Sequence, residues 1–143
     1  TGDEKAQSKL KLNFNHPVKE LIWVEQAKDA NTVGDYVTTY DEAHIQLNGH
    51  DRTSARKPTY YQLVQPYQHH ERVPTEVGQY INVYSFALKP EEHQPSGTCN
   101  MSRIDNATLN LKGVESENTV KVFAVNYNVL RIMSGMGGLA YSN

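Results

Sequence analysis

Six residues whose side chains could do chemistry gather in two short stretches of the sequence. In chain order they are His69, His70, Glu71, Glu91, Glu92 and His93. Imidazole and carboxylate groups together bind metal ions or transfer protons. His69 and His70 are adjacent, however, and they lie between Pro66 and Pro74 in a polar segment, whereas ligands on a strand occupy alternate positions. This pattern favours a solvated or hydrogen-bonded loop, and we predict no metal site, no cofactor and no catalytic residue.

Cys99 is the only cysteine in the sequence, which excludes an intrachain disulfide bond. No signature of an activated thiol surrounds it, and a lone cysteine most often packs as a small apolar side chain. We therefore predict a structural role for Cys99, in a protein that is assembled in a reducing compartment.

A dense group of glycines, Gly135, Gly137 and Gly138, lies close to the C-terminal end. A phosphate-binding loop would need a lysine and a following helix, but residues 139–142 have the pattern of a strand. These glycines are therefore predicted to form a tight turn with positive φ angles.

Two sequons make Asn100 and Asn106 candidate glycosylation sites. Both asparagines fall at or inside predicted strands, and the polar N-terminal residues do not form a secretory signal. The sequence therefore favours chance occurrence of both motifs.

Tyrosine dominates the aromatic residues, with 9 Tyr against 3 Phe and 1 Trp. A tyrosine ring packs on one side while its hydroxyl forms hydrogen bonds, which suits sheet faces and edges that meet water or a partner. Aromatic residues also anchor protein contacts. The predicted interface residues are Tyr60, Tyr61, Tyr67, His69 and His70.

The length of 143 residues is typical of a protein of one domain. The chain has 14 basic and 16 acidic side chains and a net charge of -2. This balance lacks the basic excess of proteins that bind nucleic acid or anionic membranes. Mean hydropathy is -0.66, and no apolar run approaches the length of about 18 residues that marks a membrane span. We expect neither nucleic-acid binding nor membrane insertion.

Alternation of apolar and polar residues marks most of the chain as β-strand. One alternating segment ends at the turn pair Asn48-Gly49, and the longest contains Phe123, Val125 and Tyr127 in alternation with smaller residues. The predicted strands cover residues 9–14, 18–26, 43–47, 60–65, 80–88, 103–111, 120–130 and 139–142. No helix of ordinary length is predicted. Eight short strands predict an all-β sandwich or barrel, and eight antiparallel strands in two sheets is the number found in a jelly roll.

Several long motifs resemble a known family. Residues 84–100 read YSFALKPEEHQPSGTCN and continue as SRIDN over 102–106. Shorter motifs are LNGHDR over 47–52 and VQPYQHH over 64–70, and the C-terminal motif over 123–142 is FAVNYNVLRIMSGMGGLAYS. Together they closely resemble the major capsid proteins of nucleocytoplasmic large DNA viruses. The ending is similar to the phycodnavirus and giant-virus branch.

The resemblance implies a structural virion protein and not an enzyme. Members of the family carry two tandem antiparallel jelly rolls, and these motifs belong to the second. Residues 1–143 are therefore expected to form a single jelly-roll domain, the C-terminal domain of a longer capsid protein. The family forms trimers in which six sandwiches make a pseudo-hexagonal capsomer of an icosahedral capsid.

The resemblance also implies partners and an orientation. The expected partners are copies of the same protein in the homotrimer and in neighbouring capsomers, the N-terminal jelly roll of the same protein, and minor capsid proteins. The expected location is the capsid shell of the virion, with assembly in the host cytoplasm. By analogy, residues 49–57 and 89–98 are expected at the outward end, and these loops contain His50, Arg52, Glu91, Glu92 and His93.

Two alternatives from other classes of protein remain. A carbohydrate-binding β-sandwich would use Tyr60, Tyr61 and Trp23 as a platform for sugars, although packing in the core explains Trp23 more simply. A cupin-like metalloenzyme would use His69, His70 or His93 as metal ligands.

Overall fold

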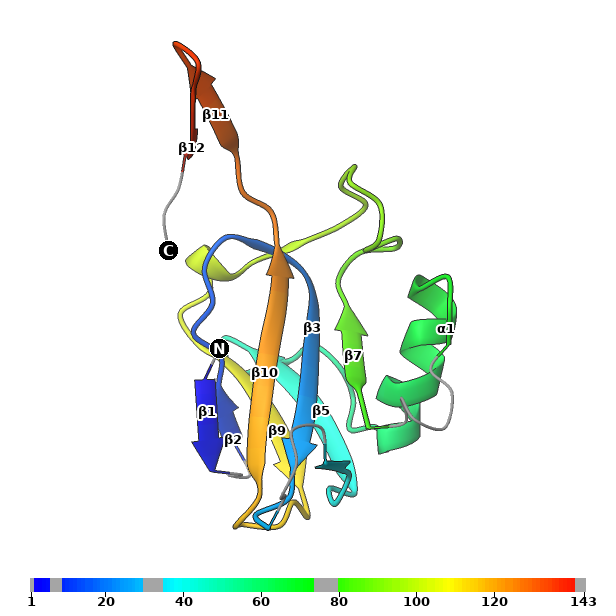
Figure 1. Ribbon diagram of the computed structural model, residues 1–143. Helices are drawn as coiled ribbons and strands as arrows, with labels where there is room; N and C mark the ends of the chain where they lie inside the picture. Colours follow the sequence, from blue (N-terminus) through cyan, green and yellow to red (C-terminus); the bar gives the residue numbers. More distant parts are fainter. Residues whose placement is uncertain (1, 6–8, 30–34, 74–79, 141–143) are drawn as a thin grey trace.

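The computed structural model describes residues 2–5, 9–29, 35–73 and 80–140. These residues form two layers of antiparallel strands, a helical segment beside them and a hairpin that projects from one end (Figure 1). No helix among them is long and apolar enough to cross a membrane.

The first sheet is built around β3, a strand of 10 residues. Its strands are β1 (Gly2–Lys5), β10 (Thr119–Asn126), β3 (Pro17–Gln26), β8 (Cys99–Asn100), β7 (Asn82–Ser85) and β4 (Tyr36–Val37). β10 pairs with β1 on one side and with β3 on the other. Three short strands share the far edge of β3, with β8 at its start, β7 in its middle and β4 at its end. The strand predicted over 18–26 is confirmed, and the one predicted over 80–88 is shorter, as β7.

The second sheet has the order β2, β9, β5, β6. Its strands are β2 (Lys9–Lys11), β9 (Ala107–Lys112), β5 (Glu42–Leu47) and β6 (His50–Asp51). Asn48 and Gly49 connect β5 to β6 with φ angles of 51° and 79°. Positive φ at both central residues is what the Asn-Gly pair predicts for a hairpin. The strands predicted over 9–14 and 103–111 are shorter than expected.

The path of the chain between the two sheets defines a jelly roll. In the described part of the chain, β1, β10, β3 and β7 form one layer and β2, β9, β5 and β6 form the other. Apart from the two-residue edge strands β4 and β8, which pair with β3, the strands β1, β2, β3 and β5 alternate between the layers in chain order, and β6, β7, β9 and β10 alternate again. The prediction of an all-β, antiparallel jelly roll is confirmed.

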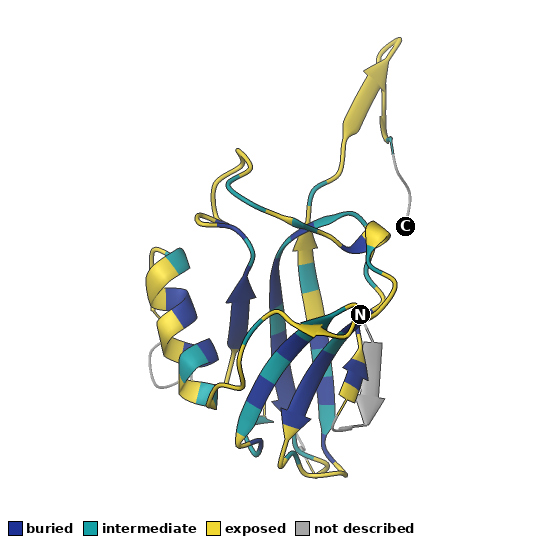
Figure 2. Cartoon of the chain, turned by 180° about the vertical axis from the view of Figure 1, so that it is seen from behind, coloured by how far each residue is buried: buried dark blue, intermediate teal, exposed yellow. Residues whose placement is uncertain are grey.

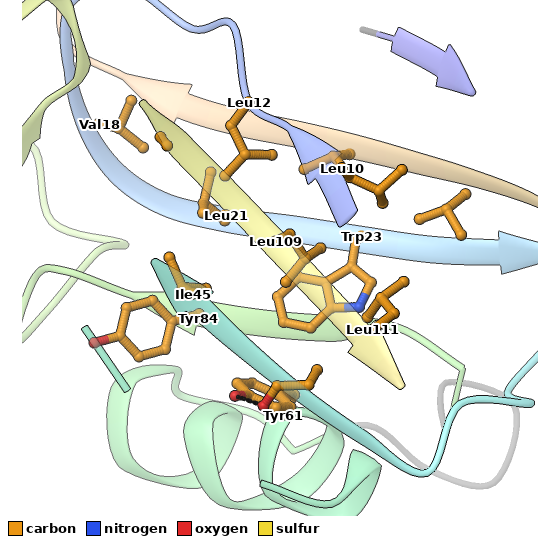
Figure 3. Packing of buried hydrophobic residues seen from close by; sticks show 14 of the residues in the cluster. Leu10, Leu12, Val18, Leu21, Trp23, Ile45, Tyr61, Tyr84, Leu109 and Leu111 are labelled. Carbon is orange, nitrogen blue, oxygen red and sulfur yellow. Dashed lines mark hydrogen bonds between the residues drawn. The ribbon is translucent and has the colours of Figure 1, made fainter. Parts of the chain in front are cut away.

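The core lies between these layers (Figures 2 and 3). Trp23 has no exposed surface, and its ring centroid lies 5.0 Å from that of Tyr61. Alternate residues of β9 and β10, among them Leu109 and Val122, complete the packing. Full burial of a side chain of this size stabilises the fold by about 1.5–3 kcal/mol. The expectation that Trp23 packs in the core is confirmed.

A helical segment replaces the strand predicted over 60–65, so that prediction is wrong. The segment contains a π-helical turn, η1 (Tyr60–Val64), followed by α1 (Gln65–His69). Tyr61, Gln62, Gln65 and Pro66 are buried, at the spacing of one helix face. The amide of Gln65 donates to the carbonyl of Tyr60, five residues earlier, which is the wide hydrogen bond of a π-helical turn. The next residue, Pro66, has no backbone amide to donate. Tyr and Val are typical of strands, which explains the error.

After β10 the chain leaves the first sheet and forms a hairpin, here called the arm. It consists of β11 (Leu130–Met133) and β12 (Met136–Leu139), which pair with each other. In Figure 1 the arm points away from the sandwich. The strand predicted over 120–130 therefore ends early, at Asn126. The last strand, β12, covers 136–139 instead of the predicted 139–142. Residues 141 and 142 of that prediction lie outside the described residues.

The turn of the arm explains part of the glycine motif. Ser134 and Gly135 have φ angles of 52° and 77°, which confirms the predicted turn at Gly135. Gly137 and Gly138 lie in β12 and have no positive φ, so the turn prediction is wrong for these two residues.

Candidate functional site: interaction surfaces around the His70 clamp

The clearest polar constellation lies at the end of α1, where one histidine bridges two glutamates. His70 Nε2 lies 2.7 Å from Oε2 of Glu20 on β3, and His70 Nδ1 lies 2.8 Å from Oε1 of Glu91. We call these three residues the His70 clamp. Both ring nitrogens meet carboxylates, so the protonated imidazole, which donates from both, fits the site.

The charges of the clamp shift the ionisation of its members. Burial by itself lowers the pKa of His70, but the hydrogen bonds and charges of Glu91 and Glu20 outweigh it and raise the pKa above 6.5. The hydrogen bond from His70 lowers the pKa of Glu91. Glu20 is 5% exposed, so its carboxylate depends on this partner.

Neighbouring residues fasten the helix to the loop after β7. Nδ1 of His69 lies 3.1 Å from the carbonyl oxygen of Leu88, and the amide of Glu71 donates to Oε2 of Glu91. A shallow hollow of about 280 Å³ lies between this helix end and the loop. The clamp therefore connects the helix, β3 and residues 86–92 into one structural unit.

The histidines and the cysteine that the sequence offers for metal or thiol chemistry lie in separate environments. His69 and His70 bond to different groups, and His93 is exposed on the following loop. In the described part of the chain, no three histidine, cysteine or acidic side chains form a metal-binding group. Burial raises the pKa of Cys99, which keeps the thiol protonated and poorly nucleophilic.

The predicted interface tyrosines occupy three different environments. Tyr61 is fully buried and donates its hydroxyl to the carbonyl of Ala43 at 2.7 Å, so its place among the interface residues is corrected to the core. Tyr60 is partly buried under the guanidinium of Arg56. Tyr67 is 77% exposed. Of the three rings, Tyr67 is the one most accessible to a partner.

Four apolar residues are exposed on the helical segment and on the loop that His69 contacts. We call these residues the helical flank: Leu63, Val64, Tyr67 and Leu88. Each is at least 40% exposed, and protein interfaces bury side chains of this kind.

The predicted outward loop over 89–98 lies near the start of β3, and the turn that opens the other loop lies near the start of β9. The amide of Asn48 donates to the carbonyl of Asn106, and Nζ of Lys19 reaches the carbonyls of Pro90 and Glu92. The side chains predicted to be presented on these loops are exposed: His50, Arg52, Glu91, Glu92 and His93. The segment 52–56 does not stay near this turn, because Arg56 pairs with Ala43 at the far part of β5. Which end faces outward stays a prediction.

Both sequon asparagines are exposed at strand ends. Asn100 is the N-cap of the short helix η3 (Met101–Arg103), and its Oδ1 accepts a hydrogen bond from the amide of Ser102. Asn106 precedes β9, and its amide donates to Oδ1 of Asn48. Their glycosylation remains untested.

Sequence reasoning missed a buried carboxylate at the other end of β3. Glu25 is 1% exposed and accepts hydrogen bonds from the amide of Thr39 at 2.9 Å and from Nδ2 of Asn118 at 2.6 Å. The only signal in the sequence is its position at the end of an apolar strand, where a glutamate is usually read as solvated.

The chain is a jelly roll with exposed apolar side chains, and the buried acids described above are engaged in structural hydrogen bonds. These features suit a sandwich that associates with other proteins. A sequence profile of the family described as "Large eukaryotic DNA virus major capsid protein" matches residues 2–138. The chain belongs to this family.

Named relatives agree with the family assignment. The major capsid protein of Pyramimonas orientalis virus is 69% identical over 163 aligned residues, which cover 100% of this chain and 41% of the relative. The major capsid protein of Paramecium bursaria Chlorella virus 1 is 41% identical, with 96% and 44% covered. A quasi-atomic model of the PBCV-1 virus capsid matches with a TM-score of 0.75 and 37% identity, covering 100% of this chain and 48% of that one. The chain thus spans less than half the length of these relatives.

Proposed function

We propose that this chain is one jelly roll of a major capsid protein that builds the icosahedral shell of a large DNA virus. The observation that carries the proposal is the match of the whole chain, in sequence and in fold, to proteins named for that role. In this proposal the full-length protein forms trimers with a pseudo-hexagonal outline, and these capsomers join their neighbours in the virion, with assembly in the host cytoplasm.

The part of the protein described by residues 1–143 is, in this proposal, the C-terminal domain. Its partners are the N-terminal jelly roll of the same protein, other copies in the trimer and minor capsid proteins. Support comes from the shares of 41% to 48% that the chain covers in its relatives, which leave room for a second sandwich of similar size.

The surfaces of the chain are suited to this role. The net charge of -2 limits repulsion between closely packed copies. We propose that the helical flank contributes to a contact between sandwiches, with Tyr67 and Leu88 as its anchors and His69 and Tyr60 at its rim. Each contact in a lattice is modest, and symmetry multiplies it.

The carbohydrate-binding alternative is not supported. Trp23 and Tyr61, two of the three rings of the expected sugar platform, have no exposed surface. The homologues are structural capsid proteins, which is consistent with a role other than catalysis.

The test is the assembly state of a full-length protein that contains this sequence. We expect native mass measurement to give a trimer and negative-stain microscopy to show pseudo-hexagonal particles. The double variant Tyr67→Ser, Leu88→Ser should weaken association between sandwiches, whereas Glu117→Gln, on a surface away from the flank, should not. A full-length wild-type protein that stays strictly monomeric would overturn the proposal.

A further inference from the structure

The arm exposes more apolar surface than packing among the described residues explains. Its apolar side chains, together with Val129 just before it, are between 54% and 76% exposed. These residues are Val129, Leu130, Ile132, Met133, Met136 and Leu139. Figure 2 shows the arm as exposed along its length. Arg131 is its one charged residue between 129 and 139. An isolated two-stranded hairpin is at best marginally stable in water, so the arm needs a partner.

The register of the arm gives it one wholly apolar face. Leu130 pairs with Leu139 and Ile132 pairs with Gly137, and directly paired residues share a face. Arg131 and Met133 lie on the opposite face with their own partners, so that face is mixed. The Leu130, Ile132, Leu139 side is therefore the side suited to burial.

Gly137 gives this face a feature that its own chain does not require. It has no positive φ, and a Cβ built on it would have no atom within 4 Å. Neither backbone conformation nor internal packing therefore calls for glycine at this position. Glycine within a strand is commonly found where another backbone approaches closely. The open space beside Ile132 fits such an approach.

The strand β10, which leads into the arm, also exposes apolar side chains. Phe123 and Val125, alternate residues of β10, are 40% and 38% exposed and form its outer stripe. The inward positions of β10 are instead filled by Val120 and Val122. Exposed apolar side chains thus gather on the arm and on the strand before it, whereas those of a monomer are normally scattered singly.

We propose that the arm and the outer stripe of β10 dock against the other jelly roll of the full-length capsid protein, with Gly137 admitting its backbone. This inference rests on the proposed function. The chain covers 41% of one relative and 48% of one matched structure, so as much polypeptide again is present in those proteins. A body tethered in the same polypeptide is present at an effective concentration of about millimolar, which favours it over a separate copy.

Hydrogen exchange of residues 129–139 in a full-length protein tests the inference. We expect these amides to exchange about a hundredfold or more slowly there than in the 143-residue chain, because docking must open before they exchange. Ile132→Glu and Gly137→Val should each remove most of this protection. Arg131→Gln, on the opposite face, is the matched control and should retain it.

The 143-residue chain supplies the control for folding. Because nothing lies near a Cβ at Gly137, Gly137→Val should leave its melting temperature unchanged, so that a loss of protection in the full-length variant reports docking.

If the wild-type full-length protein forms trimers while its arm exchanges as fast as in the 143-residue chain, the inference is wrong and the proposed function stands. If the arm is protected in the 143-residue chain as its concentration is raised, a second copy is the occupant and the inference is wrong. A strictly monomeric full-length protein whose arm is nevertheless protected would support the inference while overturning the proposed function.

Discussion

Glu20 and His70 are separated by 50 residues, yet their side chains meet at 2.7 Å. The glutamate is buried on β3, and the histidine ends the helix α1. Glu91 binds the second ring nitrogen, so three distant segments depend on the protonation state of one imidazole.

The His70 clamp predicts that stability falls as pH rises above neutrality. The pKa of His70 is raised above its ordinary 6.5, so its stabilisation is fully present below pH 6.5 and is lost as pH rises through the folded-state pKa. The pKa of Glu91 is lowered from 4.5, so its contribution is present above pH 4.5 and is lost as pH falls. The clamp contribution to the free energy of unfolding should therefore be largest between these values. Urea unfolding at a series of pH values measures it.

Two histidine variants separate the clamp from other titrating groups. His70→Gln should abolish the decline above pH 6.5 that the clamp causes, whereas His93→Gln, on an exposed loop, should preserve it. An unchanged decline in His70→Gln would remove the clamp as its cause.

Glu25→Gln should destabilise the sandwich by about 2–4 kcal/mol, because the new amide group would face hydrogen-bond donors in a buried site. The carboxylate of Glu25 accepts from Thr39 and Asn118 and is 1% exposed. Chemical denaturation measures the loss. Glu117→Gln, which breaks an exposed pair with Lys28, should change stability by less than about 1 kcal/mol and serves as the control. Equal effects of the two variants would contradict the buried role of Glu25.

Tyr61→Phe should cost about 0.5–1.5 kcal/mol of stability, because the carbonyl of Ala43 loses one of its two donors and keeps the amide of Arg56. Tyr67→Phe should have almost no effect on the isolated chain, since that ring is 77% exposed. Thermal unfolding of the two variants side by side checks the assignment. A Tyr67 effect as large as that of Tyr61 would show that the exposed ring also supports the fold.

Gly97→Ala should destabilise the chain more than Gly49→Ala, by about 1–3 kcal/mol. Both glycines have positive φ, so both substitutions strain the backbone. A Cβ at Gly97 would also lie 2.6 Å from the carbonyl oxygen of Phe86, whereas one at Gly49 would meet nothing within 4 Å. Urea unfolding of the two variants measures the difference in their free energies of unfolding. Equal losses would show that the loop after β7 moves enough to accommodate the new Cβ at position 97.

Local patterns predicted the sheets well, because their information is local. The alternation around Ile45 and the Asn48-Gly49 pair specify a strand and its hairpin turn without reference to the rest of the chain. Trp23, in a short run of β-branched and apolar residues, was correctly expected in the core.

The errors arise where tertiary contacts decide. The local pattern predicts a strand over 60–65 and an interface position for Tyr61, but the contacts with Trp23 and Ala43 favour a helix that inserts the ring into the core. The roles of Glu20 and Glu25 depend on partners at His70 and Asn118, far away in sequence. No periodicity can encode such pairings.

The attachment of the arm has a mechanical consequence. The arm is continuous with β10, and β10 is hydrogen-bonded to β1 on one edge and to β3 on the other. Tension applied through the arm would pull along this strand, so many hydrogen bonds on both edges would resist it in shear. A strand at the edge of the sheet would instead unzip one bond at a time. The arm is thus anchored at a place in the sandwich that can bear a pulling force.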